Sequence, residues 1–182
     1  MNLLAALARD AEAHGLRFLV IGGLAVNAYG YSRTTLDIDL LVERSTAESW
    51  APLLLALGYQ PLERESGPFR QWNPPISGMS PIDFMLVNEA TFAGFWAAAR
   101  DAEVGGARFR IPSLEHLFAL KLHALKHAAA HRDARDFGDL LHLIHLHKLR
   151  VDDEAFAKLV EKYGPADALQ RIRHAVQSLP SG

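Results

Sequence analysis

Two aspartates stand two residues apart inside an apolar stretch of this 182-residue chain. The segment Leu36–Val42 reads LDIDLLV, and its branched residues predict a strand. On a strand, Asp37 and Asp39 point to one face while Ile38 points into the core. Two carboxylates this close repel each other unless a cation lies between them or one of them takes up a proton. Oxygen ligands suit Mg²⁺ or Mn²⁺, so the pair is either a metal site or a strand end with two solvated acids.

Two adjacent glycines, Gly22 and Gly23, follow a short apolar strand that we expect over Arg17–Ile21. A short helix is expected directly after them, over Leu24–Tyr29. Glycines at such a junction let backbone N–H groups approach a phosphate without a Cβ in the way. Alternatively, they form a tight turn that binds nothing. The glycines and the acids together are more specific, because one element offers amides to a triphosphate and the other offers ligands to its metal.

A third carboxylate is needed for a two-metal centre, because two monodentate acids supply too few negative ligands. Asp83 is the best candidate, since it lies near the start of a strand expected over Ile82–Val87. That strand is expected to pair beside Leu36–Val42, so the three acids would converge. The alternative is an ordinary aspartate at the start of a strand.

These residues resemble a known family. An apolar residue, Gly-Gly, a gap and then Asp-x-Asp is similar to the signature of the DNA polymerase β-type nucleotidyltransferase superfamily. The segment GGLAVNAYGYSRTTLDIDLLV more narrowly resembles the minimal AbiEii/MenT-like group, which is known from bacterial toxin–antitoxin systems. A second block, IPSLEHLFALKLHALKHAAAHRDARDFGDLLHL, is similar to the helical segment of that group. Its motif, a lysine followed by R-x-x-[KR]-D-x-x-D-L, falls on Lys121, Arg132, Arg135, Asp136 and Asp139.

The resemblance implies a role for each residue that matches the signature. Gly22 and Gly23 would bind the nucleotide phosphates, Asp37 and Asp39 would ligate Mg²⁺ or Mn²⁺, and Asp83 would complete the site beside the acceptor hydroxyl. The expected reaction transfers a nucleoside monophosphate from a nucleoside triphosphate to an acceptor, with release of pyrophosphate. The acceptor is open between RNA, a protein side chain and a small hydroxyl compound such as an antibiotic. An antitoxin or a second copy of the chain is a further possible partner. The alternative function is a catalytically silent protein of this fold that binds nucleotide, RNA or a partner protein.

Two cationic side chains are further candidates. Arg33, in the loop before the acidic strand, is expected to contact a phosphate or the aspartates. Lys121 lies in an otherwise apolar helical stretch, where a lone ammonium needs a partner. Contact with a phosphate and a buried pair with Asp136 or Asp139 are equally open for it. Those two acids share one helix face, so they either orient Lys121 or pair with Arg132 and Arg135.

Histidines and aromatic residues supply weaker candidates. His123, His127 and His131 have a spacing that can chelate zinc, but polar faces of packed helices are the favoured interpretation. Phe69 and Trp72 are either core residues or a surface on which a nucleobase stacks.

Composition limits the class of protein. The chain has no cysteine, so disulfides and thiolate metal sites are excluded. Its net charge of −2 does not indicate a strong electrostatic footprint for nucleic acid. No apolar stretch is long enough to predict a membrane span or a secretory signal, so a cytoplasmic protein is expected.

The chain is expected to fold as an α+β protein in which a mixed sheet flanked by helices precedes a helical extension. Residues 1–112 form the mixed part and residues 113–182 a helical part that packs on it as a single compact unit. The remaining strands are expected at Gln60–Arg64, Phe69–Asn73 and Arg108–Ile111. Helices are expected over Asn2–His14, from Ser45 or Thr46 to Leu57, and over Ala90–Arg100, Ser113–Ala130, Arg135–His147, Asp152–Tyr163 and Ala166–Leu179.

Overall fold

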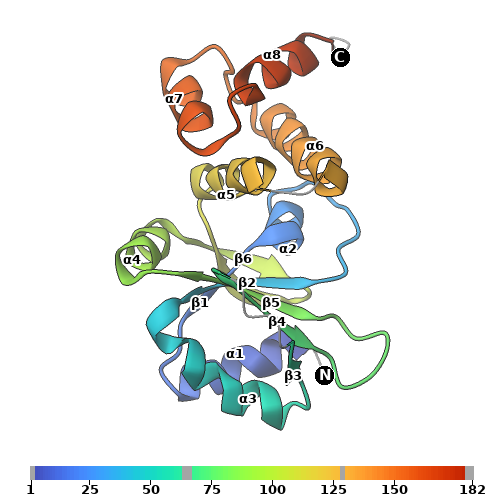
Figure 1. The fold of residues 1–182 in the computed structure, drawn as a ribbon, viewed down its shortest axis with the longest axis vertical. Helices are drawn as coiled ribbons and strands as arrows, with labels where there is room; N and C mark the ends of the chain where they lie inside the picture. Colours follow the sequence, from blue (N-terminus) through green and yellow to red (C-terminus); the bar gives the residue numbers. More distant parts are fainter. Residues whose placement is uncertain (1–2, 63–66, 128–129, 179–182) are drawn as a thin grey trace. The chain divides into compact units, whose positions relative to one another are not determined.

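The computed structural model describes residues 3–62, 67–127 and 130–178, with the side chains of 130–133 outside that description. The chain divides into two compact units. One unit comprises Met1–Ala28 and Arg33–Ser113, and the other comprises Tyr29–Ser32 and Leu114–Gly182. The fold is α+β, with a five-stranded mixed sheet and eight α-helices in the described residues, as the sequence predicts (Figure 1).

The five-stranded sheet belongs to the first unit and has the order β1-β2-β5-β4-β3. The two central strands, β2 and β5, are parallel, whereas β1 and β4 pair with them antiparallel from either side. Parallel strands are commonly covered by helices on both faces of the sheet. The strands are β1 (Phe18–Val20), β2 (Ile38–Glu43), β3 (Gln60–Pro61), β4 (Phe69–Asn73) and β5 (Ile82–Val87).

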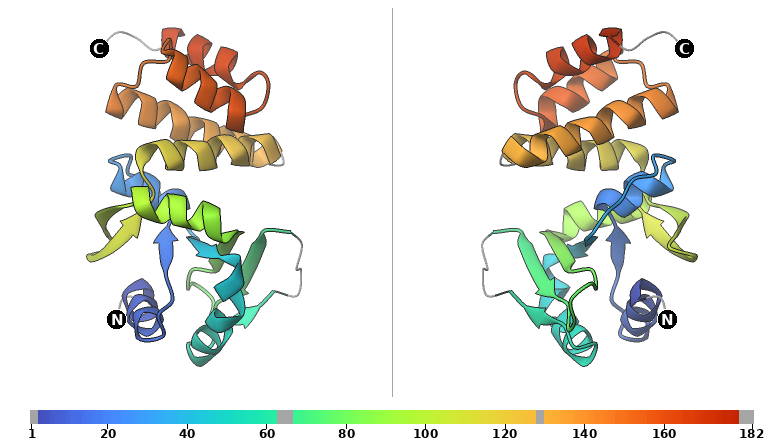
Figure 2. Two further views of the ribbon diagram at one scale, coloured as in Figure 1. Left: turned by 90° about the vertical axis from the view of Figure 1, so that its left-hand side faces the viewer. Right: turned by 90° about the vertical axis from the view of Figure 1, so that its right-hand side faces the viewer.

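Helices cover both faces of this sheet. In Figures 1 and 2, α1 and α3 lie on one face, while α2 and α4 lie on the other. A two-stranded sheet, β6-β7, follows α4, and its second strand lies against β1. The elements are α1 (Leu3–Ala13), α2 (Gly22–Ala28), the 3-10 helix η1 (Arg44–Trp50), α3 (Ala51–Ala56), α4 (Glu89–Ala98), β6 (Arg100–Val104) and β7 (Ala107–Ile111).

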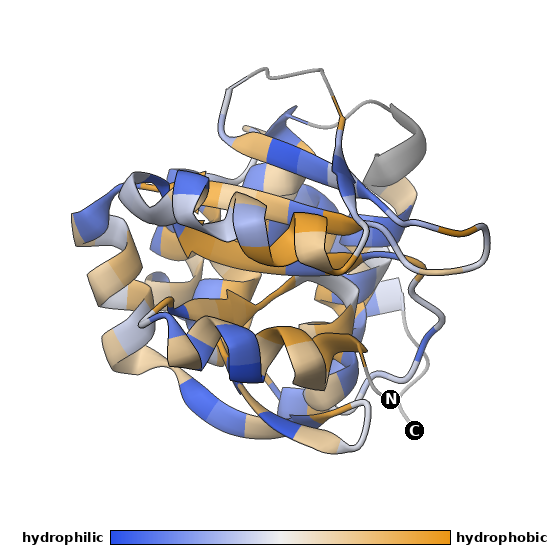
Figure 3. Cartoon of the chain, turned by 90° about the horizontal axis from the view of Figure 1, so that it is seen from below, coloured by the Kyte–Doolittle hydropathy of each residue, from blue (hydrophilic) through white to orange (hydrophobic). Residues whose placement is uncertain are grey.

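The core of this unit lies on the sheet face that holds alternate residues of β2 and β5. Leu40 and Phe84 pair across the two strands and are fully buried. The Trp50 ring meets the Phe84 ring edge-on, with centroids 5.4 Å apart. Figure 3 shows apolar residues concentrated on the strands. Burial of apolar area at about 25 cal/mol per Å² is the main force that holds the sheet in place.

The second unit consists of four helices: α5 (Leu114–His127), α6 (Ala130–His147), α7 (Glu154–Tyr163) and α8 (Ala168–Ser178). Phe118 and Phe156 meet edge-on at 5.6 Å between α5 and α7. Leu122, Leu143 and Ile172 are buried. Along the described residues, no helix is both long and apolar enough to cross a membrane.

Several sequence predictions of element bounds were wrong, among them the helix expected over Arg135–His147, which is α6 and begins at Ala130. The single helix expected up to Leu57 is a 3-10 turn followed by α3, because Pro52 lies in the first turn of α3 and starts a new helix. The helix expected over Ala90–Arg100 ends at Ala98, and Arg100 begins β6. Gly105 and Gly106, both with positive φ, form the tight turn that returns the chain into β7.

Candidate active site

The two central strands place Asp39 and Asp83 side by side. Asp39 on β2 is the direct register partner of Asp83 on β5. Direct partners in a sheet point to the same face, one strand spacing of about 4.8 Å apart. Both residues are half-buried, whereas Leu40 and Phe84, the next residues on the opposite face, are fully buried. The strand pairing therefore holds two acids together on the less buried face of the sheet.

The turn at Gly22 lies directly against this pair. The Ile21 N–H donates to the Asp39 carbonyl oxygen at 2.9 Å, which joins the end of β1 to β2. Gly22 has φ +60°, and a Cβ added there would overlap the Asp39 carboxylate. Only glycine fits both the left-handed backbone and the close approach. The turn at Gly22 and Gly23, the glycine turn, thus lies against the Asp39–Asp83 pair, the acid row. The sequence predicts such an arrangement for a site that binds a phosphate and its metal.

Gly23 is enclosed by the loop that precedes β2. A Cβ added to Gly23 would lie 2.6 Å from Thr35 Oγ1 and 3.1 Å from Arg33 Nη1. Arg33 is held there by Asn27 on α2, whose Oδ1 accepts the Arg33 N–H at 3.0 Å and whose Nδ2 donates to the Arg33 carbonyl at 2.9 Å. The Arg33 guanidinium therefore lies beside the glycine turn, where it can neutralise a phosphate.

Asp37, unlike Asp39 and Asp83, does not lie on a strand. It lies in a bend one residue before β2 begins, and its carbonyl accepts from Thr35 Oγ1 at 3.4 Å. Strand alternation does not govern its direction at such a bend. Within residues 3–62, 67–127 and 130–178, no three His, Asp or Glu side chains are grouped closely enough to hold a metal ion. The convergence of all three acids expected from the sequence is therefore absent here, and the role of Asp37 as a metal ligand stays a prediction.

Lys121 forms a buried charged triad in the second unit. Its Nζ lies 2.7 Å from Asp136 Oδ1 and 2.6 Å from Asp139 Oδ2, and these three side chains are 9%, 12% and 1% exposed. Of the two alternatives for Lys121, the structure shows the buried pair, with both acids as partners. Arg135 is exposed, and the Arg132 side chain lies outside the described residues. Contact of Lys121 with a nucleotide stays a prediction.

The histidines do not form a described metal cluster. The His123 and His127 rings lie 4.4 Å apart, and the His131 side chain falls outside the described residues. Burial lowers the pKa of His123, and the charges of His127 and Lys126 lower it further. The zinc site considered for these three histidines therefore stays a prediction.

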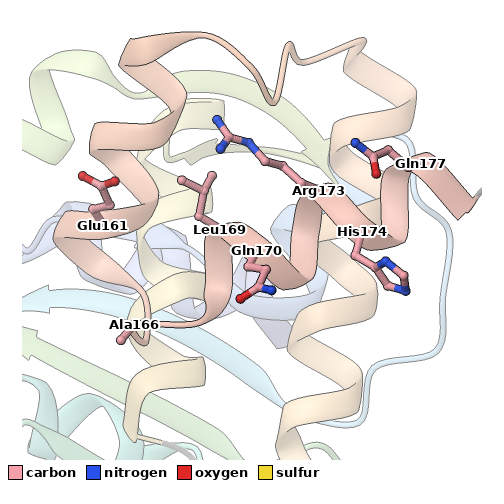
Figure 4. Close-up of a pocket in the computed structure, with 7 residues that line it drawn as sticks. All are labelled: Glu161, Ala166, Leu169, Gln170, Arg173, His174 and Gln177. Carbon is pink, nitrogen blue, oxygen red and sulfur yellow. The ribbon is translucent and has the colours of Figure 1, made fainter.

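A surface groove in the second unit contains none of the predicted site residues. Figure 4 shows Glu161 of α7 on one side and side chains of α8 on the other. Arg173 in this groove is engaged by the second unit itself, since its Nε donates to the Val151 carbonyl at 3.3 Å. The groove is therefore lined by residues of the second unit alone.

Sequence reasoning missed two residues that shape the site. Asn27 was assigned only to a helix, although a polar side chain in the apolar segment GGLAVNA was a usable signal. Thr35 was not among the candidate residues, although its side chain fills the space that a Cβ at Gly23 would need. Neither contact can be predicted from local sequence, because both form only when the loop before β2 folds back against α2.

Solved structures with the same fold are nucleotidyl-transfer proteins. The lincosamide antibiotic adenylyltransferase LnuA, solved with lincomycin bound, has a TM-score of 0.54 at 14% identity, over 75% of this chain and 93% of that chain. ANT(2")-Ia in complex with adenylyl-2"-tobramycin has a TM-score of 0.54 at 17% identity, over 97% and 95%. An antigenic nucleotidyltransferase-like protein from Paracoccidioides brasiliensis has a TM-score of 0.57 at 14% identity, over 98% and 87%. At these identities the likeness shows the fold alone.

No curated protein matches the chain. A family model described as "Uncharacterised nucleotidyltransferase" matches residues 1–180, nearly the whole sequence. The glycine turn, the paired acids and the fold agree with that match. The chain therefore belongs to this nucleotidyltransferase family.

Proposed function

We propose that the protein is a metal-dependent enzyme that transfers a nucleoside monophosphate from a nucleoside triphosphate to an acceptor hydroxyl. One observation supports this most strongly: Asp39 and Asp83 are register partners, and the Gly22 backbone lies against the Asp39 carboxylate. A structural pair of acids has no need of a left-handed glycine pressed against it. The combination suits a triphosphate whose phosphates and metal must lie within a few ångströms of each other.

The donor set fits Mg²⁺ or Mn²⁺. Asp39 and Asp83 supply carboxylate oxygens from adjacent strands, and Asp37 precedes Asp39 by two residues in the bend before β2. When bound, the metal would neutralise charge on the attacking and leaving oxygens. Carboxylates without sulfur or imidazole ligands favour these hard cations over zinc.

The remaining groups bind and orient the reactants. The backbone amides of Gly22 and Gly23 would donate to the triphosphate, and Arg33 would pair with one of its phosphates. The acceptor oxygen attacks the α-phosphorus, and the bond from that phosphorus to the bridging oxygen breaks, so pyrophosphate leaves. The acceptor proton passes to the Asp83 carboxylate or to solvent. Positioning supplies much of the rate, because the reacting atoms are held in line.

The proposal extends to the acceptor and to the narrower subgroup. Lincomycin and adenylyl-tobramycin are bound in the similar solved structures, which favours a small hydroxyl compound as acceptor. RNA and protein acceptors are the other outcomes to test. Membership in the AbiEii/MenT-like group, an antitoxin partner, self-association and a cytoplasmic location stay predictions from the sequence.

The test is incubation of the protein with α-labelled nucleoside triphosphates, Mg²⁺ and either cell RNA or a small-molecule extract. We expect label on an acceptor, with loss of transfer in Asp39→Ala. Glu43→Gln is the matched control, because Glu43 lies at the far end of the same strand β2. Transfer that persists in Asp39→Ala would refute the assigned site. No transfer and no binding of Mg²⁺ with nucleotide would favour the catalytically silent alternative.

A further inference from the structure

The acid row of the sheet continues onto a third strand. Gln71 on β4 is the direct register partner of Asp83 on β5, as Asp83 is of Asp39 on β2. Direct partners share a face, so the row Asp39, Asp83, Gln71 runs across three neighbouring strands. Gly22 lies at the opposite end of this row, against Asp39. Gln71 therefore lies on the side of Asp83 away from the glycine turn.

The Gln71 side chain is half-buried, and its carboxamide makes no hydrogen bond within the described residues. Its backbone is already committed, since its carbonyl accepts the Leu62 N–H at 2.8 Å. A half-buried carboxamide offers two donors at Nε2 and an acceptor at Oε1. Such a group on a rigid strand is suited to orienting a bound hydroxyl.

The same face of β4 is uncharged. Phe69 and Asn73 flank Gln71 at strand spacing, and both are exposed, Phe69 to 54%. Arg70, the one basic residue of β4, belongs to the other face, where its Nη2 pairs with Glu48 at 2.7 Å. A polynucleotide acceptor would need cations along this path, because phosphates dominate its binding. The neighbouring acids would instead repel it.

We propose that Gln71 binds the acceptor, and that the acceptor is a neutral or cationic hydroxyl compound lying over β4 against Phe69. This inference rests on the proposed function, because it uses Asp39 and Asp83 to fix where the nucleotide ends. The triphosphate occupies the glycine end of the row and the acceptor occupies the Gln71 end. The acceptor hydroxyl thereby lies next to Asp83, which receives its proton. Gln71 orients the compound through a hydrogen bond, and Phe69 packs on its apolar surface.

The test follows the side-chain amide NMR signals of the ¹⁵N-labelled full chain with Mg²⁺ and a non-hydrolysable ATP analogue. Three probes are added separately: tobramycin, lincomycin and a short RNA with a free 3′-hydroxyl. The Gln71 signals are assigned by their loss in Gln71→Leu. We expect at least one small hydroxyl probe to shift them, with a dissociation constant weakened about tenfold in Gln71→Leu. Gln71→Asn, which retains a shorter carboxamide, should show an intermediate loss.

Arg70→Leu is the matched control, because it removes a side chain from the adjacent position on the opposite face. It should bind the probe as the original chain does, and melting temperatures of all variants show that the fold is kept. Binding of RNA alone, or probe binding that Gln71→Leu leaves unchanged, overturns the inference. The inference is also overturned if the nucleotide analogue binds but no probe shifts the Gln71 signals. In that case the proposed function stands. If the nucleotide analogue itself does not bind with Mg²⁺, both proposals fail.

Discussion

Two pairs of aspartates in the described residues have different surroundings. Asp136 and Asp139 of the second unit enclose the Lys121 ammonium at 2.7 and 2.6 Å and are almost fully buried. Asp39 and Asp83 of the first unit are half-buried register partners flanked by a glycine backbone and by an uncharged glutamine. In the first arrangement, the chain itself supplies the cation that pairs with both acids. The second is only partly buried.

The difference shows how carboxylates of one type acquire different roles. Two buried charges are tolerable only with an opposite charge and good geometry, which the lysine supplies in the second unit. In the first unit, strand register fixes the distance between the acids, while glycine leaves room beside them. Burial together with a built-in cation thus indicates a structural pair. Partial exposure beside a glycine turn indicates a binding site.

Removal of one acid from each pair gives the largest contrast. Asp83→Asn should lower nucleotidyl transfer about 1,000-fold, because a group that stabilises transition-state charge is lost. Its free energy of unfolding should stay the same or rise, since repulsion between the two acids is relieved. Labelled transfer and urea unfolding measure the two quantities. An equal loss of stability in Asp83→Asn and Asp139→Asn would erase the contrast.

Loss of the lysine should act on stability. In Lys121→Met, two buried acids face each other without a cation, and the free energy of unfolding should fall by about 3 kcal/mol. Transfer per folded molecule should change little. Urea unfolding and active-site titration are the measurements. If the variant were fully stable but had lost nucleotide affinity, the phosphate-binding role of Lys121 would be supported instead.

A glycine comparison isolates close approach from backbone strain. Gly22 and Gly15 have φ of +60° and +65°, but a Cβ meets Asp39 only at Gly22 and nothing within 4 Å at Gly15. Gly15→Ala should lose about 1 kcal/mol of stability from the left-handed backbone, and Gly22→Ala should lose more because its Cβ also overlaps Asp39. Only Gly22→Ala should also lose at least about tenfold in transfer. Equal transfer in the two variants would show that the contact with Asp39 has no function.

The smallest effect concerns pH in the second unit. Burial lowers the pKa of His116 in the folded protein below 6.5, and Glu115 opposes this only in part. The unfolded chain therefore binds more protons, so stability falls as pH drops below about 6.5 and the loss levels off below the folded pKa. His116→Gln should reduce the loss of stability between pH 7 and pH 5. Thermal unfolding over that range checks this, and an unchanged pH profile would contradict it.

The paired strands were predictable because their residues are locally distinctive. Branched apolar runs predicted β2 and β5, and their expected pairing brought Asp83 beside the Asp-x-Asp strand. The position of Asp37 was less predictable, because strand alternation applies only once the strand has begun. The sequence also left Lys121 between two interpretations, since only the packing of α5 on α6 brings its partners to it. Gln71 could be recognised only from the register of β4.

Manganese binding tests the central claim, that Asp39 and Asp83 form the metal and nucleotide site, most directly. Mn²⁺ is titrated with a non-hydrolysable ATP analogue and followed by electron paramagnetic resonance in Asp39→Asn, Asp83→Asn and Asp136→Asn. The account predicts that the first two lose bound Mn²⁺ at least about tenfold, while folded Asp136→Asn retains it. Undiminished Mn²⁺ binding in Asp39→Asn and Asp83→Asn, or its loss only in Asp136→Asn, would contradict the account.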